Sequence, residues 1–214
     1  MRSKFSKARE MEPIPPEAFE PILAELHRRP LPQNPYRLKA GAGQTQAFGL
    51  VNRRCLPPDY SRQCWKRPYL YKLLLDFGQK YVPIPFTSIT LNQNYAAAPH
   101  RDKGNVGDSF LVAFGSFKGG ELVIHETDLS GTHDICYRPI VANFSKMLHS
   151  VRPFEGERFS LVFYTYNLRN NPAPPEASVV WSDGRWRFKR GDDFCDGLPH
   201  PITEFYRKKK AAEG

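Results

Sequence analysis

From Val82 onward the sequence changes to short, β-rich segments separated by turns, and this pattern constrains the fold more than any other feature. Closely spaced strands of this kind are typical of an all-β sandwich or jelly roll. The expected strands are residues 86–95, 109–115, 120–126, 134–138, 140–144 and 158–167. Another strand is expected at 46–54. Residues 178–190 are predicted to form a hairpin across Asp183-Gly184, a two-residue turn signal.

Two amphipathic helices are expected on the N-terminal side of this core. Residues 16–29 have acidic side chains early and basic ones late, which suits the helix dipole. Residues 67–81 also place apolar side chains on one helical face. The two apolar faces comprise Phe19, Ile22, Leu23 and Leu26 in the first helix and Leu70, Leu73, Leu74 and Phe77 in the second. The expected fold class is therefore α+β and mainly β, with flanking N-terminal helices.

The chain of 214 residues is long enough for one domain with extensions. Prolines crowd both ends, so we expect irregular termini around a compact centre. Residues 1–45 are expected to form an N-terminal extension that contains a helix, with residues 1–15 disordered or loosely packed. Residues 46–190 would form the main domain with its supporting helix, and residues 191–214 a basic C-terminal tail.

A net charge of +9 and a pI near 9.4 favour an anionic partner, nucleic acid first. The residues that could grip phosphates include Arg53, Arg54, Lys66, Arg67, Lys103 and the lysines of the tail.

No stretch approaches the roughly 18 to 20 apolar residues of a membrane span, and the basic N-terminus is followed by no apolar signal region. We therefore expect an intracellular monomer, nuclear if eukaryotic, with no membrane partner. Four cysteines are widely spread without a Cys-x-x-Cys motif, which favours reduced thiols.

The segment His-Arg-Asp-Lys-Gly-Asn, residues 100–105, carries the first chemical signal. Side chains alternate along an extended strand, so His100 and Asp102 lie on one side and can share a metal ion. With a distant second histidine they would form the 2-His-1-carboxylate facial triad of non-haem Fe(II) oxygenases. The histidines downstream are His125, His133, His149 and His200. His149 is favoured because a short apolar segment brings it to the edge of a turn, nine residues before Arg158.

The last core strand has two different faces. With a period of two, one face presents Arg158, Ser160, Val162, Tyr164 and Tyr166, and the other presents Phe159, Leu161 and Phe163. The first face suits a ligand pocket and the second suits the core. Arg158 could bind a carboxylate of a co-substrate as a bidentate pair. Arg152 is an alternative, but it precedes a proline and is better placed to contact a phosphate or solvent.

The segments PHRDKGNVGDS, GGEL and MLHSVRPFEGERFSLVFY, in this order, resemble the double-stranded β-helix (jelly-roll) core of Fe(II)/2-oxoglutarate dioxygenases. The resemblance is strongest to the TET/JBP family, which oxidises methyl groups of bases in DNA, and it covers residues 85–168. The Cys-rich zinc-binding region of animal TET proteins is missing. The chain therefore looks like a minimal microbial, fungal, algal or viral member.

The resemblance implies the ligands of the cofactors. His100, Asp102 and His149 would be the catalytic residues that bind Fe(II). Arg158 would bind the distal carboxylate of the co-substrate 2-oxoglutarate, with Ser160 assisting, and O2 would be the second co-substrate.

The resemblance also implies a substrate site for a base flipped out of methylated duplex DNA. The family's His-x-Asp-x-x-Asn pattern places Asn105 in contact with that base, and Tyr164 would stack on it or line its pocket. Tyr166 stands where TET enzymes commonly have a histidine that contacts the methylcytosine edge, so Tyr166 is a candidate for substrate binding.

The implied reaction oxidises the methyl group of 5-methylcytosine in DNA to 5-hydroxymethylcytosine or to more oxidised products. One alternative keeps the iron chemistry but acts on N6-methyladenine, thymine or a protein prolyl residue. Another is a non-catalytic DNA-binding barrel, against which the intact triad and Arg158 argue.

Overall fold

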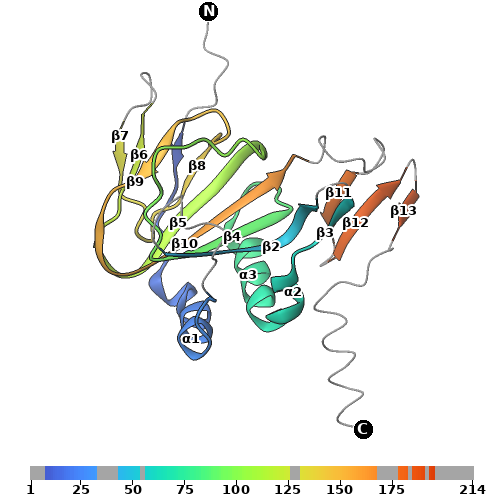
Figure 1. Ribbon diagram of the computed structural model, residues 1–214, viewed down its shortest axis with the longest axis horizontal. Coiled ribbons are helices and arrows are strands. Elements are labelled where there is room, and N and C mark those ends of the chain that lie inside the picture. Colours follow the sequence, from blue (N-terminus) through green and yellow to red (C-terminus); the bar gives the residue numbers. More distant parts are fainter. Residues whose placement is uncertain are drawn as a thin grey trace, which may run out of the picture.

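The computed structural model describes residues 8–32, 43–53, 56–125, 131–167, 178–182, 185–190 and 193–195. The largest element in these residues is a seven-stranded antiparallel sheet with the strand order β1-β8-β5-β10-β4-β2-β3 (Figure 1). Its strands are β1 (Arg9–Glu10), β2 (Gln44–Arg53), β3 (Leu56–Tyr60), β4 (Ser88–Gln93), β5 (Asn105–Gly119), β8 (Ile140–Ala142) and β10 (Phe154–Tyr166). The long strands β5 and β10 pair from Phe154↔Gly119 to Tyr166↔Asn105 and form the centre of the sheet.

A smaller antiparallel sheet is built from the segment between β5 and β10. It has the order β7-β6-β9 and consists of β6 (Leu122–Ile124), β7 (Gly131–His133) and β9 (His149–Val151). His100 forms an isolated antiparallel bridge with His149, so the loop before β5 runs along the edge of this small sheet. From β5 the chain passes to β6 and β7 of the small sheet, returns to β8 of the large sheet, and crosses again through β9 to β10. This alternation between two sheets is the double-stranded β-helix arrangement expected from the sequence.

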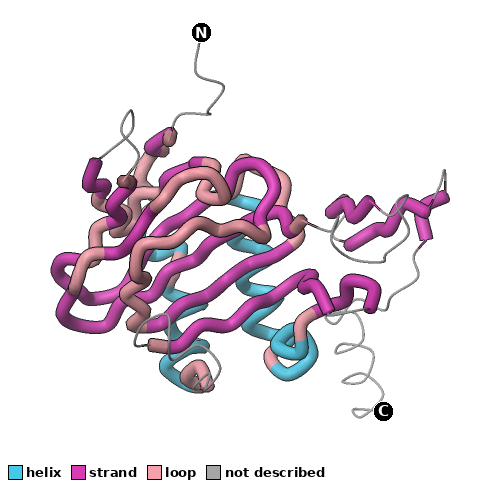
Figure 2. The backbone as a smooth tube through the Cα atoms, turned by 45° about the horizontal axis from the view of Figure 1, so that its top comes forward, coloured by secondary structure: helices cyan, strands magenta, loops and turns pink. Residues whose placement is uncertain are grey.

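The helices lie on one side of the large sheet, as Figure 2 shows. They are η1 (Pro16–Ala18), α1 (Glu20–Arg28), α2 (Arg62–Lys66) and α3 (Pro68–Tyr81). Phe19 stacks on Phe114 of β5, with 4.8 Å between ring centroids, and also contacts Phe77 of α3 at 4.9 Å. Burying an aromatic or aliphatic side chain contributes about 1.5–3 kcal/mol, so this layer supplies much of the stability.

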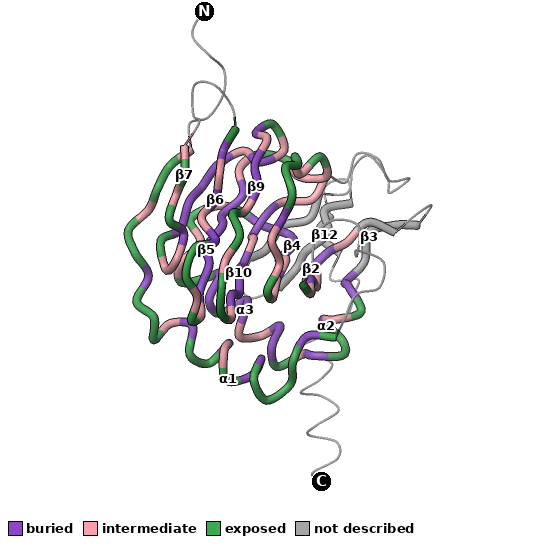
Figure 3. The backbone as a smooth tube through the Cα atoms, turned by 60° about the vertical axis from the view of Figure 1, so that its left-hand side comes forward, coloured by how far each residue is buried: buried purple, intermediate pink, exposed green. Residues whose placement is uncertain are grey.

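The two faces of β10 enter different environments. Phe159, Leu161 and Phe163 are fully buried in the helix-covered core. A second buried cluster joins residues of both sheets and includes Leu111, Ile140, Leu122, Ile124, Phe144 and Met147. In Figure 3 the buried segments run through the central strands, while the outer side of the helices is exposed. The large sheet therefore has an apolar core on its helix-covered face and, on its other face, a second apolar cluster beside the polar side chains.

The prediction of a strand at residues 134–138 is wrong. In this region β7 ends at His133, and Cys136 makes only an isolated parallel bridge to Ala113. The carboxylate of Asp134 accepts a hydrogen bond from the backbone N–H of Cys136 at 2.9 Å. Such an Asx turn gives the backbone a local partner in place of a ladder, so the segment stays a loop.

The expectation of a loosely packed N-terminus is wrong for residues 8–15. Strand β1 pairs with β8 through Arg9↔Val141 and Glu10↔Ile140. Ile14 is buried, and its backbone N–H donates to the carbonyl of Tyr137 at 2.8 Å. Residues 1–7 lie outside the described part of the chain.

The predicted C-terminal hairpin is confirmed. Strand β11 (Ser178–Ser182) pairs with β12 (Arg185–Arg190) up to Ser182↔Arg185, although the turn dipeptide itself lies outside the described residues. Strand β13 (Asp193–Cys195) pairs with β12 in what was expected to be the start of the tail. The remainder of that tail, residues 196–214, is not described. Among the described residues no helix is both long and apolar enough to span a membrane.

Candidate active site

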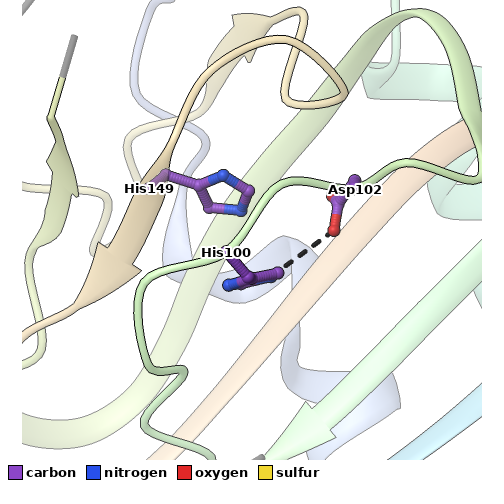
Figure 4. A group of neighbouring side chains, drawn as sticks. All are labelled: His100, Asp102 and His149. Atoms are coloured by element: carbon purple, nitrogen blue, oxygen red, sulfur yellow. Dashed lines mark ion pairs between the residues drawn. The ribbon is translucent and has the colours of Figure 1, made fainter.

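His100, Asp102 and His149 come together in one cluster, the metal triad (Figure 4). Their ligand atoms all lie within 4.8 Å of one another. His149 opens β9, whereas His100 and Asp102 lie in the loop before β5. The backbone N–H of each histidine donates to the carbonyl of the other, at 2.9 and 3.0 Å, and the backbone N–H of Asp102 donates to the carbonyl of Phe144 at 2.9 Å. The main chain therefore fixes the position of all three ligands.

In both imidazole rings, Nδ1 forms a hydrogen bond with a backbone carbonyl group. His100 Nδ1 lies 2.8 Å from the carbonyl oxygen of Ala98, and His149 Nδ1 lies 3.0 Å from that of Met147. A carbonyl oxygen can only accept, so each Nδ1 must carry the proton. In a neutral ring the lone pair is then on Nε2, which is the arrangement of histidines that bind a metal.

The inner atoms of the triad can bind a cation. His100 Nε2 lies 3.4 Å from Asp102 Oδ1. With the proton on Nδ1, two electron-rich atoms would face each other unless a proton or a metal ion bridges them. Burial lowers the pKa of His149, which keeps that ring neutral and able to donate its lone pair. The three side chains therefore fit a divalent transition metal with two nitrogen ligands and one oxygen ligand.

Arg158 is the second unusual group of the site. Its side chain is 1% exposed, and within the described residues it forms no ion pair with a carboxylate. Nη2 donates to the carbonyl of Gly120 at 3.1 Å, and the guanidinium lies over the rings of Phe117 and Phe154. Nε is buried without a hydrogen-bond partner, and burial lowers the pKa of the group to about 10. A buried cation with an unused donor is suited to an anionic ligand.

The triad and Arg158 line a single cavity of about 560 Å³. Every residue on the predicted pocket face of the last strand lines it, namely Arg158, Ser160, Val162, Tyr164 and Tyr166. The period-two prediction for this strand is thus confirmed. Arg152, the alternative to Arg158, is exposed and lies outside the lining.

The sequence did not single out the polar residues that β4 contributes to the cavity. Asn92 Nδ2 donates to Ser160 Oγ at 3.1 Å, and Thr90 Oγ1 lies 3.3 Å from the Tyr164 hydroxyl. On β4 the polar Thr90 and Asn92 alternate with the buried Ile89 and Leu91. The same period-two pattern that marked the last strand could have identified them.

Asn105 also lines the cavity, with its amide nitrogen 3.4 Å from Asp102 Oδ2 and 3.3 Å from Ser109 Oγ. An ionised carboxylate cannot donate, so the amide group facing Asp102 must be its NH2. Both of its hydrogens are therefore committed, and the carbonyl oxygen Oδ1 is left as an acceptor.

The other candidates from the sequence lie elsewhere. His125 contacts Ser150 Oγ at 2.8 Å and His133 contacts Glu10 at 2.8 Å, and neither belongs to the triad. His200 lies outside the described residues. Arg67 is buried beside Glu25 and is therefore wrong as a phosphate contact, whereas Lys66 and Lys103 are exposed.

No model of a known protein family matches this chain, and a search of curated proteins also gives no match. Among solved structures, one described as NgTET1 in complex with 5mC DNA aligns with a TM-score of 0.54 at 14% identity, over 75% of this chain and 72% of that one. The chain has the double-stranded β-helix fold.

Two further structures align less closely. A 2OG-Fe(II) oxygenase family oxidoreductase from Burkholderia pseudomallei gives a TM-score of 0.47 at 21% identity, covering 66% of this chain and 74% of that chain. A prolyl-4-hydroxylase from Pseudomonas putida gives 0.48 at 16% identity, covering 75% and 92%.

Proposed function

We propose that this protein is an Fe(II)/2-oxoglutarate-dependent dioxygenase, with His100, Asp102 and His149 as iron ligands. The observation that carries the proposal is the presence in one cavity of the metal triad and of a buried arginine without a carboxylate partner. The triad accounts for the metal, and Arg158 accounts for a dicarboxylate co-substrate.

The co-substrate would be held through its distal carboxylate. Arg158 would pair with the distal carboxylate of 2-oxoglutarate, whose charge offsets the desolvation of the guanidinium. Ser160, already held by Asn92, would add a hydrogen bond to the same carboxylate. Iron, when bound, supplies the activation of O2 that allows oxidation of an unactivated methyl group. The protein's own task is to orient the co-substrate and the methyl group and to exclude water.

We further propose that the substrate is a methylated base in duplex DNA, with 5-methylcytosine as the leading candidate. A base must leave the stack to reach a buried iron, and aromatic side chains such as Tyr164 and Tyr166 offer stacking surfaces. Their rings are 6.2 Å apart and line the cavity. Asn105 presents only an acceptor, which suits the exocyclic amine of cytosine or adenine better than O4 of thymine.

Three further observations support DNA as the partner. The net charge is +9, Lys103 lies exposed at the cavity, and the solved structure with the TM-score of 0.54 is described as bound to 5mC DNA. Lys103 would contact a phosphate beside the flipped nucleotide. We also propose that the protein acts as a monomer.

Metal and co-substrate binding can be tested by spectroscopy. Anaerobic addition of Fe(II) and 2-oxoglutarate should give a weak visible charge-transfer band. The band should disappear in His149→Ala and persist in His125→Ala, which removes a nearby histidine outside the triad. Absence of the band in the parent protein would refute the iron assignment.

The substrate can be tested by mass spectrometry of nucleosides after incubation with several modified duplexes. We expect 5-hydroxymethylcytosine from 5-methylcytosine. Turnover only of N6-methyladenine, of thymine or of a prolyl peptide would keep the iron chemistry and reject the proposed base. Binding of DNA without any turnover would indicate a non-catalytic barrel.

A further inference from the structure

We propose that Asn105 is a positioning residue that holds the iron ligand Asp102, and that Ser109 anchors Asn105 in turn. This inference rests on the proposed function, because it concerns the same metal triad. The sequence suggested only a contact between Asn105 and the substrate. The hydrogen bonds of its amide point instead to a second role toward the metal.

The two carboxylate oxygens of Asp102 have different neighbours. Oδ1 faces His100 Nε2 at 3.4 Å, on the side where a metal would bind. Oδ2 faces Asn105 Nδ2 at 3.4 Å. Within the described residues, Asn105 provides the only side-chain hydrogen bond to this carboxylate. Asn105 would therefore hold Oδ2 in a hydrogen bond and leave Oδ1 on the metal side, so that Asp102 would offer the metal a single oxygen.

The amide of Asn105 is fixed from the other side by the core. The second hydrogen of Nδ2 points to Ser109 Oγ at 3.3 Å. Ser109 is fully buried in β5 and pairs with Ala142 of β8. Asp102 itself is only half-buried and lies in a loop. The contact thus connects a loop ligand to a rigid strand.

The backbone supports the same arrangement. The N–H of Asn105 donates to the carbonyl of Asp102 at 2.9 Å and closes a turn over residues 102–105. This turn ends where β5 begins, so the side chain of Asn105 folds back over Asp102. Partners of metal ligands typically affect metal affinity by 10- to 100-fold, by orienting the ligand before the metal arrives.

The test measures metal affinity in the absence of DNA and 2-oxoglutarate. The probe is Mn(II) added to the full chain, with free Mn(II) followed by its electron paramagnetic resonance signal. Asn105→Ala should weaken Mn(II) binding by about 10- to 100-fold. Ser109→Ala should weaken it by about 3- to 10-fold, and adding it to Asn105→Ala should have little further effect, because both act through one contact.

Asn92→Ala is the matched control. It removes the same amide from the same cavity, but Asn92 donates to Ser160 and not to the triad. We expect its Mn(II) affinity to equal that of the parent, and thermal melting checks that all variants fold. Equal affinity of Asn105→Ala, Asn92→Ala and the parent would overturn this inference and leave the proposed function intact. A parent that binds no Mn(II) would overturn both.

Discussion

Replacing Arg158 by methionine should change the stability of the unliganded protein little and should abolish the binding of 2-oxoglutarate. Burial lowers the pKa of Arg158 from its ordinary 12.5 to about 10. One pH unit corresponds to about 1.4 kcal/mol, so the buried charge costs the unliganded fold about 3 kcal/mol. Because the pKa of the folded state is the lower one, this cost is present at pH 7 and disappears only as the pH rises above about 10.

The contributions of the contacts that the guanidinium makes are together at least as large as this cost. The two ring contacts contribute about 0.5–2 kcal/mol each, and the hydrogen bond to the Gly120 carbonyl contributes about 1.5–3 kcal/mol. Methionine fills a similar volume without the charge. Methionine also keeps contacts with the two rings, so we expect unliganded Arg158→Met to be within about 1 kcal/mol of the parent, although it removes a fully buried side chain.

Ligand binding should distinguish the parent protein from Arg158→Met. With Mn(II) present, anaerobic 2-oxoglutarate at a hundred times its Kd should raise the free energy of unfolding of the parent by about 2.7 kcal/mol. For a chain of this length that is a rise in Tm of about 5–10 °C. Arg158→Met should show only the rise due to Mn(II). Arg152→Met is the control, since it removes the same charge from an exposed position outside the cavity and should behave as the parent.

Two results would refute this reasoning. If unliganded Arg158→Met lost more than about 3 kcal/mol, Arg158 would be a structural residue like other buried groups whose removal breaks a network. If the variant kept the full rise in Tm with 2-oxoglutarate, the dicarboxylate would bind elsewhere. Chemical denaturation and differential scanning calorimetry provide the two measurements.

Gly120→Ala should weaken 2-oxoglutarate binding at least tenfold in calorimetry, because the new Cβ would lie 2.7 Å from Arg158 Nε at a φ of +75°. Gly119→Ala, with a φ of +79° and a contact to the Pro153 carbonyl at 2.6 Å, should destabilise the fold and leave the guanidinium in place. Cys64 should resist iodoacetamide in the native protein at pH 8 and react after denaturation, as read by peptide mass spectrometry. Burial raises its pKa to about 12, leaving about one thiolate in ten thousand. Rapid labelling of the native protein would contradict this.

Local periodicity was enough to predict the parts of the protein that depend on it. The helix over residues 68–81 and the two faces of β10 follow from the spacing of apolar side chains, because one face of each must be buried. The metal triad was also predicted, since His100 and Asp102 are neighbours in the chain and His149 precedes a strand of distinct character. The helix and the two strand faces need no knowledge of the remaining topology, whereas the bridge between His100 and His149 brings the triad together.

Tertiary structure decided which distant groups meet. Pairing of β4 with β10 brings Asn92 to Ser160, and pairing of β5 with β8 buries the Ser109 that anchors Asn105. Burial, which no pattern of charges reveals, removed Arg67 from the surface and left Arg158 without a carboxylate partner in the described residues. The sequence by itself determined which side chains of β10 share the cavity face, because side-chain alternation is a local property. The orientation of Asp102 and the need of Arg158 for an anion arise only when strands remote in the chain pack together, since desolvation and hydrogen bonding depend on the whole fold.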